Sequence, residues 1–463
     1  MFQQLLRIIS RKRSENLSQD HVFHRNFNNN YPLIERGEGV YLYDTQGVRY
    51  LDGSSGAVAV NIGHGVQEVV NAMTKQASHV AYVHTLRFET SLQHELASMI
   101  ASLAPGDLDT VYFTSGGAEA NESALKLARQ YHLGNNDQEK FKVISHSISY
   151  HGNTMRTLSI GGDQKRKELY DKELHGGVIH LAPPYGKRSD FENLQEDEYV
   201  DYCLNQIEKK ILEEDPETIS CFLIEPIVGS QIAAFPMPDG YLKGIRKLCT
   251  QYNILLVADE VMTGFGRTGE MFAVNHWRVT PDIITFAKGV SSAYAPLGGM
   301  IVNNKTIQTI KDKWDGKFAH GYTFSGHPVA LAAGKANINY LLDKELVPNV
   351  KQKGRYLRKR LSELMEKFTC IGDLRGRGLM LGFEIYKNKK TREPFNQSQK
   401  AAEELNQICI ENGVVFYPGQ GLIDQQPFDH ILVAPPFVIT DNEIDHMVDL
   451  LEKSLKIFER RFK

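Results

Sequence analysis

Residues 254–289, ILLVADEVMTGFGRTGEMFAVNHWRVTPDIITFAKG, contain two short apolar runs that each end in an ionisable residue. The first run ends at Asp259, and the second starts at Ile283 and ends at Lys288. Short apolar runs bounded by turn residues predict buried strands. Buried strands that alternate with helices are typical of a mostly parallel sheet covered on both faces, so this stretch predicts an α/β fold.

The same alternation continues on the N-terminal side and changes beyond residue 330. Predicted strands occupy residues 111–115, 142–145, 219–225, 254–259 and 283–288, and predicted helices occupy 118–132, 201–214 and 241–252. Further on, charged helical patterns at 328–342, 347–368, 399–412 and 441–458 surround strand-like runs at 378–385, 414–417 and 430–434.

Three segments are predicted from this organisation. Residues 65–330 form a large domain with a mostly parallel sheet, and residues 331–463 form a smaller α+β domain. Residues 1–64 form an N-terminal segment that packs with the small domain, beginning with an amphipathic helix over residues 1–14.

Composition excludes several classes of protein. The chain has 463 residues, 41% hydrophobic and 24% charged, which is typical of a soluble globular protein. Its 53 basic and 56 acidic residues give a net charge of -3, which argues against nucleic-acid binding. No apolar run reaches the roughly 18 residues that span a membrane. Five widely spaced cysteines without a C-x-x-C pair argue against disulfides and zinc, so we expect a reducing, cytoplasmic location and no metal site.

Polar residues stand at the ends of the predicted strands. Ser115 precedes Gly116-Gly117, while Glu225, Asp259 and Lys288 each close an apolar run. Ligands of open α/β sheets bind in the crevice outside the carboxyl ends of the strands. Each residue alone could be an ordinary strand-terminal polar group, but together they indicate one functional crevice.

Lys288 and Asp259 suggest a specific chemistry. Burial lowers the pKa of a lysine, and an unprotonated amine is a nucleophile toward carbonyls, as in pyridoxal phosphate (PLP) enzymes. An aspartate about 4 Å from a pyridine nitrogen stabilises the protonated form of that nitrogen by up to ~4 kcal/mol at an effective dielectric near 20. The protonated ring is then an electron sink for a substrate carbanion.

Two further motifs fit a flat phosphorylated cofactor. In Ser115-Gly116-Gly117-Ala118-Glu119-Ala120-Asn121-Glu122, a glycine pair precedes a helix, where backbone N–H groups bind phosphate. Tyr150-His151-Gly152 follows a predicted strand and offers an aromatic ring for stacking. A simple capped turn and a core tyrosine are the structural alternatives for these two motifs.

A competing signal is the G-x-G-x-x-G pattern of residues 264–269, which would favour a dinucleotide site. The next firm strand begins only after Pro281, and the pattern alone is weak. We therefore keep a nucleotide-dependent dehydrogenase as an alternative of another class.

The motifs together resemble the class III (ω-transaminase-like) PLP-dependent aminotransferases. The resemblance runs from about Tyr41 to the C-terminus through VYFTSGGAEANESALKLARQYH, YHGNT, FLIEPIVG, LLVADEVMTGFGRTGEMFA, PDIITFAKG, APLGGMIV and HGYTFSGHPVA. It implies PLP fold type I and a homodimer whose active sites lie at the subunit interface.

The resemblance also implies residue roles. Lys288 would hold PLP as an internal aldimine, and Asp259 would face the pyridine nitrogen. Glu225 would lie near the cofactor hydroxyl or the substrate. Ser115, Gly116 and Gly117 would bind the cofactor phosphate. Tyr150, which is next to His151, and Val261 would contact the two faces of the ring. Thr323 would bind the phosphate of the neighbouring subunit's cofactor.

Two departures from the family pattern concern the substrate. Met262 stands where many relatives have Gln, and Leu432 stands where ornithine-type members have Arg. An aliphatic side chain cannot bind a carboxylate as a guanidinium does. Arg87, Arg375 and Arg377 stay open as carboxylate partners or as structural charges.

We therefore predict a PLP-dependent aminotransferase that moves an amino group from an amine or ω-amino acid to a keto acid such as pyruvate. A racemase, epimerase or aminomutase on the same fold is the alternative, because the same carbanion serves all of them. The expected partners are small molecules and a second copy of the chain, with no nucleic acid and no membrane.

Overall fold

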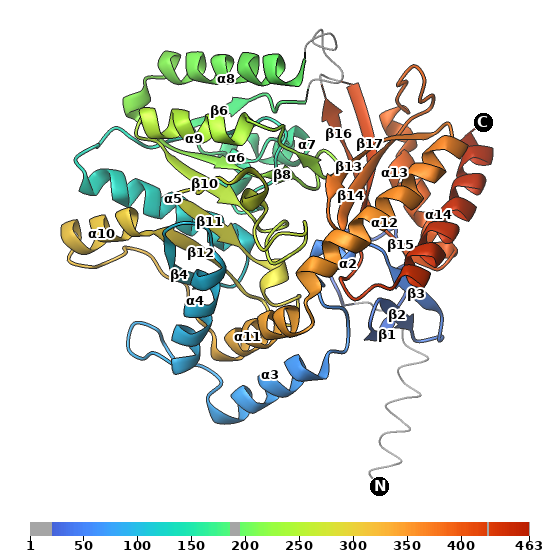
Figure 1. Ribbon diagram of the computed structural model, residues 1–463, viewed down its shortest axis with the longest axis horizontal. Helices are drawn as coiled ribbons and strands as arrows, with labels where there is room; N and C mark the ends of the chain where they lie inside the picture. Colours follow the sequence, from blue (N-terminus) through green and yellow to red (C-terminus); the bar gives the residue numbers. More distant parts are fainter. Residues whose placement is uncertain (1–20, 186–194, 424–425, 463) are drawn as a thin grey trace.

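The computed structural model describes residues 21–185, 195–423 and 426–462. The helix predicted over residues 1–14 lies outside these residues. Figure 1 shows a large sheet with helices on both faces and, beside it, a smaller sheet backed by the C-terminal helices.

The large sheet has seven strands. They are β4 (Leu108–Thr114), β5 (Lys142–His146), β6 (Val178–Leu181), β7 (Ile219–Ile224), β10 (Leu255–Asp259), β11 (Ile283–Phe286) and β12 (Gly298–Asn303). Their order is β4-β12-β11-β10-β7-β5-β6, and β12 runs antiparallel to both of its neighbours while the other pairs are parallel. The prediction of a mostly parallel sheet is confirmed.

Strand β7 illustrates why the sheet is covered on both faces. All six of its residues are buried. Side chains alternate between the faces of a strand. Cys221 and Leu223 accordingly pack into the core with Val257 on one face, and Phe222 and Ile224 pack into the core on the other.

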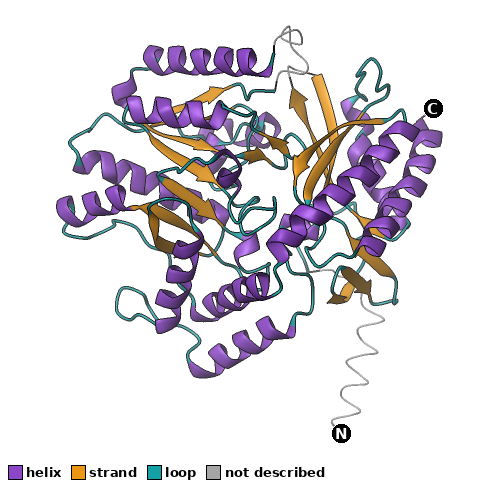
Figure 2. Cartoon of the chain, in the orientation of Figure 1, coloured by secondary structure: helices purple, strands orange, loops and turns teal. Residues whose placement is uncertain are grey.

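Helices cover this sheet on both faces, as Figures 1 and 2 show. The helices of this part of the chain are α3 (Gln67–His79), α4 (Ser91–Leu103), α5 (Gly117–Gly134), α6 (Met155–Ile160), α7 (Gln164–Lys167), α8 (Glu196–Glu213), α9 (Tyr241–Gln251), α10 (Asn304–Lys313) and α11 (Pro328–Asp343). Helix α5 packs against β11 and β12, and α11 packs against α3 and α4.

The smaller sheet is antiparallel, with the order β13-β14-β17-β16. Its strands are β13 (Ile371–Arg377), β14 (Met380–Ile385), β16 (Tyr417–Ile423) and β17 (Gln426–Val433), and the nearby helices are α12 (Leu346–Lys367), α13 (Ala401–Glu411) and α14 (Asp441–Phe462). A short hairpin of β8 (Ile227–Val228) and β9 (Phe235–Pro236) contacts β13.

A third sheet joins both ends of the chain. It contains β1 (Ile34–Glu38), β2 (Tyr41–Asp44), β3 (Arg49–Asp52) and β15 (Val414–Val415), and α2 (Ser55–Val58) follows it. Strand β15 pairs in parallel with β3, Val414 opposite Leu51. This pairing brings the N-terminal strands to the C-terminal part of the chain, while the predicted domain bounds stay a prediction.

The described residues can be compared with the predictions on membrane helices and on cysteines. No helix there is long and apolar enough to cross a membrane. All five cysteines are free thiols, and Cys203 is the one that is not fully buried.

Candidate active site

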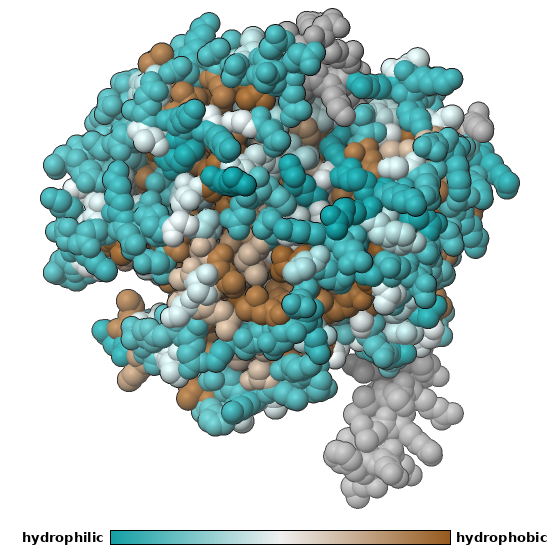
Figure 3. Space-filling model, in the orientation of Figure 1, coloured by the Kyte–Doolittle hydropathy of each residue, from teal (hydrophilic) through white to brown (hydrophobic). Residues whose placement is uncertain are grey.

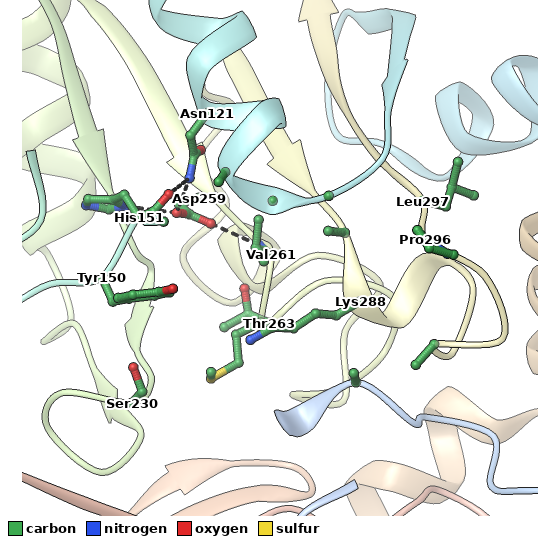
Figure 4. A pocket seen from close by; sticks show the side chains of 18 of the residues that line it. Asn121, Tyr150, His151, Ser230, Asp259, Val261, Thr263, Lys288, Pro296 and Leu297 are labelled. Carbon is green, nitrogen blue, oxygen red and sulfur yellow. Dashed lines mark hydrogen bonds and ion pairs between the residues drawn. The ribbon is translucent and has the colours of Figure 1, made fainter. Parts of the chain in front are cut away.

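A cavity of about 500 Å³ lies at the carboxyl ends of the central strands (Figure 4). Nine of the ten predicted site residues line it, namely Ser115, Gly116, Gly117, Tyr150, His151, Glu225, Asp259, Val261 and Lys288. The structure therefore brings together residues that are up to 173 positions apart in sequence because the parallel strands end at the same edge.

The sequence predicted that Lys288 ends a strand, but in the structure Lys288 lies in a turn after the strand. Strand β11 ends at Phe286, and Lys288 begins a 3₁₀ turn, η5 (Lys288–Val290), with φ of +46°. Left-handed backbone is uncommon for a residue with a side chain. The surrounding protein desolvates the ammonium group and lowers the pKa of Lys288 to about 8, although Asp259 and Glu225 favour its charged form.

The Asp259 carboxylate is held by three donors. Asn121 Nδ2 and His151 Nδ1 each lie 2.8 Å from its Oδ2 atom, and the backbone N–H of Val261 donates to Oδ1 at 3.1 Å. Asn121 is held in turn by the Thr285 hydroxyl, which donates to its Oδ1 atom at 2.6 Å. Asp259 is only 5% exposed, so the network fixes a buried negative charge in one orientation.

His151 connects this network to strand β5. Its Nε2 atom lies 3.1 Å from the Ser145 hydroxyl, and its backbone carbonyl accepts from Asn121 Nδ2 at 2.7 Å. Asn121 and Ser145 were not singled out in the sequence. Asn121 lies one helical turn after Gly117 inside the glycine motif, and that spacing is the one signal that could have found it.

Glu225 follows the last residue of β7 and faces the same cavity. Its carboxylate accepts from the backbone N–H groups of Tyr150 at 3.0 Å and Gly229 at 3.2 Å. Burial raises the pKa of Glu225 to about 7, and the charge of Asp259 acts in the same direction. The group can therefore carry a proton near neutral pH.

The glycine motif forms the N-terminal end of helix α5. A Cβ atom built on Gly116 meets nothing within 4 Å, whereas one on Gly117 would lie 2.7 Å from Val261 Cγ1. The backbone is thus open at Gly116 and tightly packed at Gly117. The Glu119 carboxylate accepts from Ser115 N at 2.8 Å. The other N–H groups of this first turn offer an anion site supported by the helix dipole.

Tyr150 and Val261 lie on different sides of the cavity, with the Lys288 amine pointing into the space beside them (Figure 4). A flat group between the two side chains would have Asp259 at one edge. The amine, carboxylate, anion site and slot therefore fit a planar anionic cofactor that carries a carbonyl.

Thr323 is the predicted residue that the structure does not bring to the cavity of its own chain. It is exposed, and its carbonyl accepts from the Tyr82 hydroxyl at 3.0 Å.

Leu432 and the three arginines do not line the cavity either. Leu432 is fully buried in β17. Arg375 pairs with Glu384 at 2.5 Å, Arg377 lies over the ring of Trp277, and Arg87 is exposed. Among the described residues that line the cavity, Lys288 is the only lysine or arginine.

The G-x-G-x-x-G segment packs between the two parts of the chain. Arg267 is fully buried and donates to the carbonyls of Leu379 at 3.0 Å and Pro435 at 2.7 Å. A short 3₁₀ helix, η4 (Ala273–Trp277), follows the segment in place of the α-helix that a dinucleotide site requires. The structure therefore gives no support to the dehydrogenase alternative.

Comparison with known proteins agrees with this geometry. The aminotransferase class-III family matches residues 22–455. The putrescine–pyruvate aminotransferase of Pseudomonas aeruginosa is 36% identical, with 91% of this chain and 90% of that protein covered. The diaminobutyrate–2-oxoglutarate transaminase of Halomonas elongata is 33% identical, with the same coverage of 91% and 90%.

Solved structures show the same likeness. An (S)-enantioselective omega-transaminase from Thermomicrobium roseum is 36% identical and has a TM-score of 0.87, with 98% of each chain covered. This similarity over nearly the whole chain confirms the predicted fold class, the type I fold of PLP-dependent transferases.

Proposed function

Because this chain belongs to the aminotransferase class-III family and is an aminotransferase, we propose that its donor is a terminal amine and its acceptor a short keto acid such as pyruvate. The proposal includes PLP as the cofactor, which the family uses. The observation that carries it is that Lys288 and Asp259 line the same cavity.

The cavity residues would hold PLP in a defined way. The residues Ser115 to Gly117, at the first turn of α5, would bind the phosphate, and Tyr150 and Val261 would contact the two faces of the ring. Bound PLP supplies a carbonyl for the donor amine and a ring that accepts electrons from the substrate carbon.

Lys288 acts as nucleophile and proton carrier. Its pKa of about 8 leaves a useful fraction of free amine near neutral pH. With PLP and a donor amine bound, the Lys288 amine would be the base that takes a proton from the substrate carbon and carries it onward. The left-handed turn at Lys288 aims the side chain into the cavity.

Asp259 and Glu225 have different electrostatic roles. Asp259 would face the pyridine nitrogen and favour its protonated form, since Asn121 and His151 hold the carboxylate in one orientation. Glu225, with a pKa of about 7, lines the same cavity and would face the cofactor hydroxyl or the substrate.

The choice of donor rests on the walls of the cavity. They carry no arginine among the described residues, and Asp259 and Glu225 would repel a carboxylate next to the reacting amine. Two relatives are named for putrescine and for diaminobutyrate, both of which have a terminal amine. We therefore infer that diamines, ω-amino acids and alkylamines react faster than α-amino acids.

The test compares half-reactions of the purified protein. Each donor is mixed with the PLP-loaded enzyme, and the visible absorbance of the cofactor is followed as it is converted to its amine form. Putrescine should react much faster than aspartate or glutamate. The enzyme with the cofactor in its amine form should then consume pyruvate. A racemase would interconvert enantiomers without consuming the keto acid, and faster reaction of the α-amino acids would contradict the choice of donor.

We further propose a homodimer in which Thr323 binds the phosphate in the partner's site. Thr323 is exposed, its carbonyl accepts from the Tyr82 hydroxyl, and the Tyr82 ring contacts Phe324. Phe324 is 57% exposed, and Leu86 and Phe88 in the segment that follows Tyr82 are 76% and 66% exposed. Figure 3 shows apolar atoms on the lobe where the loop between α3 and α4 projects. Solvent-exposed apolar side chains gathered in this way favour a protein interface.

Subunit mixing tests this assembly. An inactive Lys288→Ala protein is mixed with an inactive Thr323 variant, so that hybrid dimers contain one site with both residues intact. Recovery of activity is expected, and a fully active monomer would contradict the proposal.

A further inference from the structure

Arg166 lies beside the cavity without lining it. It belongs to the short helix α7, and its guanidinium carbon lies 4.9 Å from the centre of the Tyr150 ring. Its Nε atom donates to Asp163 at 2.9 Å, which fixes the base of the guanidinium group. The side chain is 36% exposed, so it is accessible at the rim of the site.

The rest of the guanidinium group is available to a ligand. The two Nη groups of Arg166 form no hydrogen bond or ion pair with any residue in the part of the chain that the structure describes. Tyr417 of β16 is close enough that the charge of Arg166 partly offsets the rise in its pKa caused by burial. Arg166 is therefore near both Tyr150 and Tyr417 of the small sheet.

A keto acid acceptor needs a cation that the cavity itself does not offer. Lys288 takes part in the chemistry, and Asp259 and Glu225 are acidic. Arg375 is already paired with Glu384, and its Nε donates to the Ile232 carbonyl at 3.0 Å.

We propose that Arg166 binds the carboxylate of the keto acid acceptor at the edge of Tyr150. The two Nη groups can donate to the two oxygens of a carboxylate. Tyr150 would place the acceptor carbonyl against the cofactor. Donors with a terminal amine and no nearby carboxylate do not need this contact. Arg166 should thus affect the half-reaction of the keto acid and not that of the donor amine. This inference rests on the proposed function.

The experiment measures both acceptor types on the PLP-loaded enzyme. Arg166→Met removes the charge at similar length, Arg166→Lys restores a charge without the bidentate fork, and Lys172→Met removes an exposed cation nearby as the matched control. Each protein is assayed with putrescine as donor and with pyruvate or propanal as acceptor. Propanal has the reacting carbonyl but no carboxylate.

The expected result is selective for the carboxylate. In Arg166→Met the KM for pyruvate should rise about tenfold or more, the cost of losing one strong ion pair. The KM for propanal and the rate of the putrescine half-reaction should stay unchanged. Arg166→Lys should recover part of the loss, and Lys172→Met should match the parent. Propanoate should also inhibit the propanal reaction less strongly in Arg166→Met than in the parent.

Other outcomes would overturn the inference. Equal increases in KM for pyruvate and propanal would mean that Arg166 only supports the Tyr150 ring. An unchanged KM for pyruvate would place its carboxylate elsewhere. If the parent protein used neither acceptor, the proposed function would fail together with this inference, whereas the first two results overturn this inference alone.

Discussion

Asp259→Asn tests the electrostatic part of the mechanism. The variant keeps the shape of the side chain and removes its charge. At about 4 Å and an effective dielectric near 20, that charge stabilises a protonated ring nitrogen by up to ~4 kcal/mol. Dividing by 1.36 kcal/mol per factor of ten gives a loss of roughly 1000-fold in rate. The amide must also turn its NH₂ toward the Val261 N–H to keep the bonds from Asn121 and His151, which sacrifices one hydrogen bond.

The assay measures single-turnover rates with saturating donor and, separately, cofactor content by absorbance. The Asn variant should bind cofactor but react roughly 1000-fold more slowly, as worked out from the pair energy. Asp239→Asn is the matched control, because this side chain is 87% exposed and does not line the cavity. An Asp259→Asn variant that reacts within about threefold of the parent rate would refute the reasoning, since that margin corresponds to less than one kcal/mol.

Three further predictions concern single residues. Lys288→Ala should still bind cofactor but lose turnover by orders of magnitude, and a fully active variant would contradict its role. For Glu225, the pKa is about 7 in the folded protein and ~4.3 in the unfolded chain, so its contribution to stability is present below the unfolded pKa and lost as pH rises toward 7. Melting temperatures of the cofactor-free protein should therefore fall between pH 5 and 8, and less so in Glu225→Gln. Leu432→Ala should lower the free energy of unfolding in denaturant titrations by about 2–5 kcal/mol and leave the KM for putrescine unchanged; a changed KM would place Leu432 in the site.

The residues of the cavity could be predicted from the sequence because the strands that carry them are parallel. Asp259 at the end of β10 stands opposite Thr285 of β11, and the chain reaches Lys288 three residues later. Residues at the carboxyl ends of neighbouring parallel strands lie close together at one edge of the sheet, and this does not depend on the details of side-chain packing. The left-handed turn at Lys288 was not predictable, since no local pattern distinguishes it from a continued strand.

Two other features depended on tertiary packing. Strand β12 was not predicted because it begins with Gly298 and Gly299, which weaken a strand pattern. In the structure these glycines allow close packing, since a Cβ atom on Gly299 would lie 2.4 Å from the Tyr112 carbonyl oxygen. Asn121 was missed for a related reason, because the direction of a helical side chain depends on how the helix docks on the sheet.

The burial of Arg267 has a consequence for how the molecule comes apart. Its guanidinium group also contacts Ser55 Oγ at 3.1 Å and Asn61 Oδ1 at 2.7 Å, in addition to the carbonyls of Leu379 and Pro435. If any of these stretches detached, part of a buried cation would lose its hydrogen bonds at a cost of several kcal/mol. The N-terminal strands, the central sheet and the C-terminal layer should therefore melt in a single cooperative transition, and a fragment that ends before residue 379 should not persist as an independently folded unit.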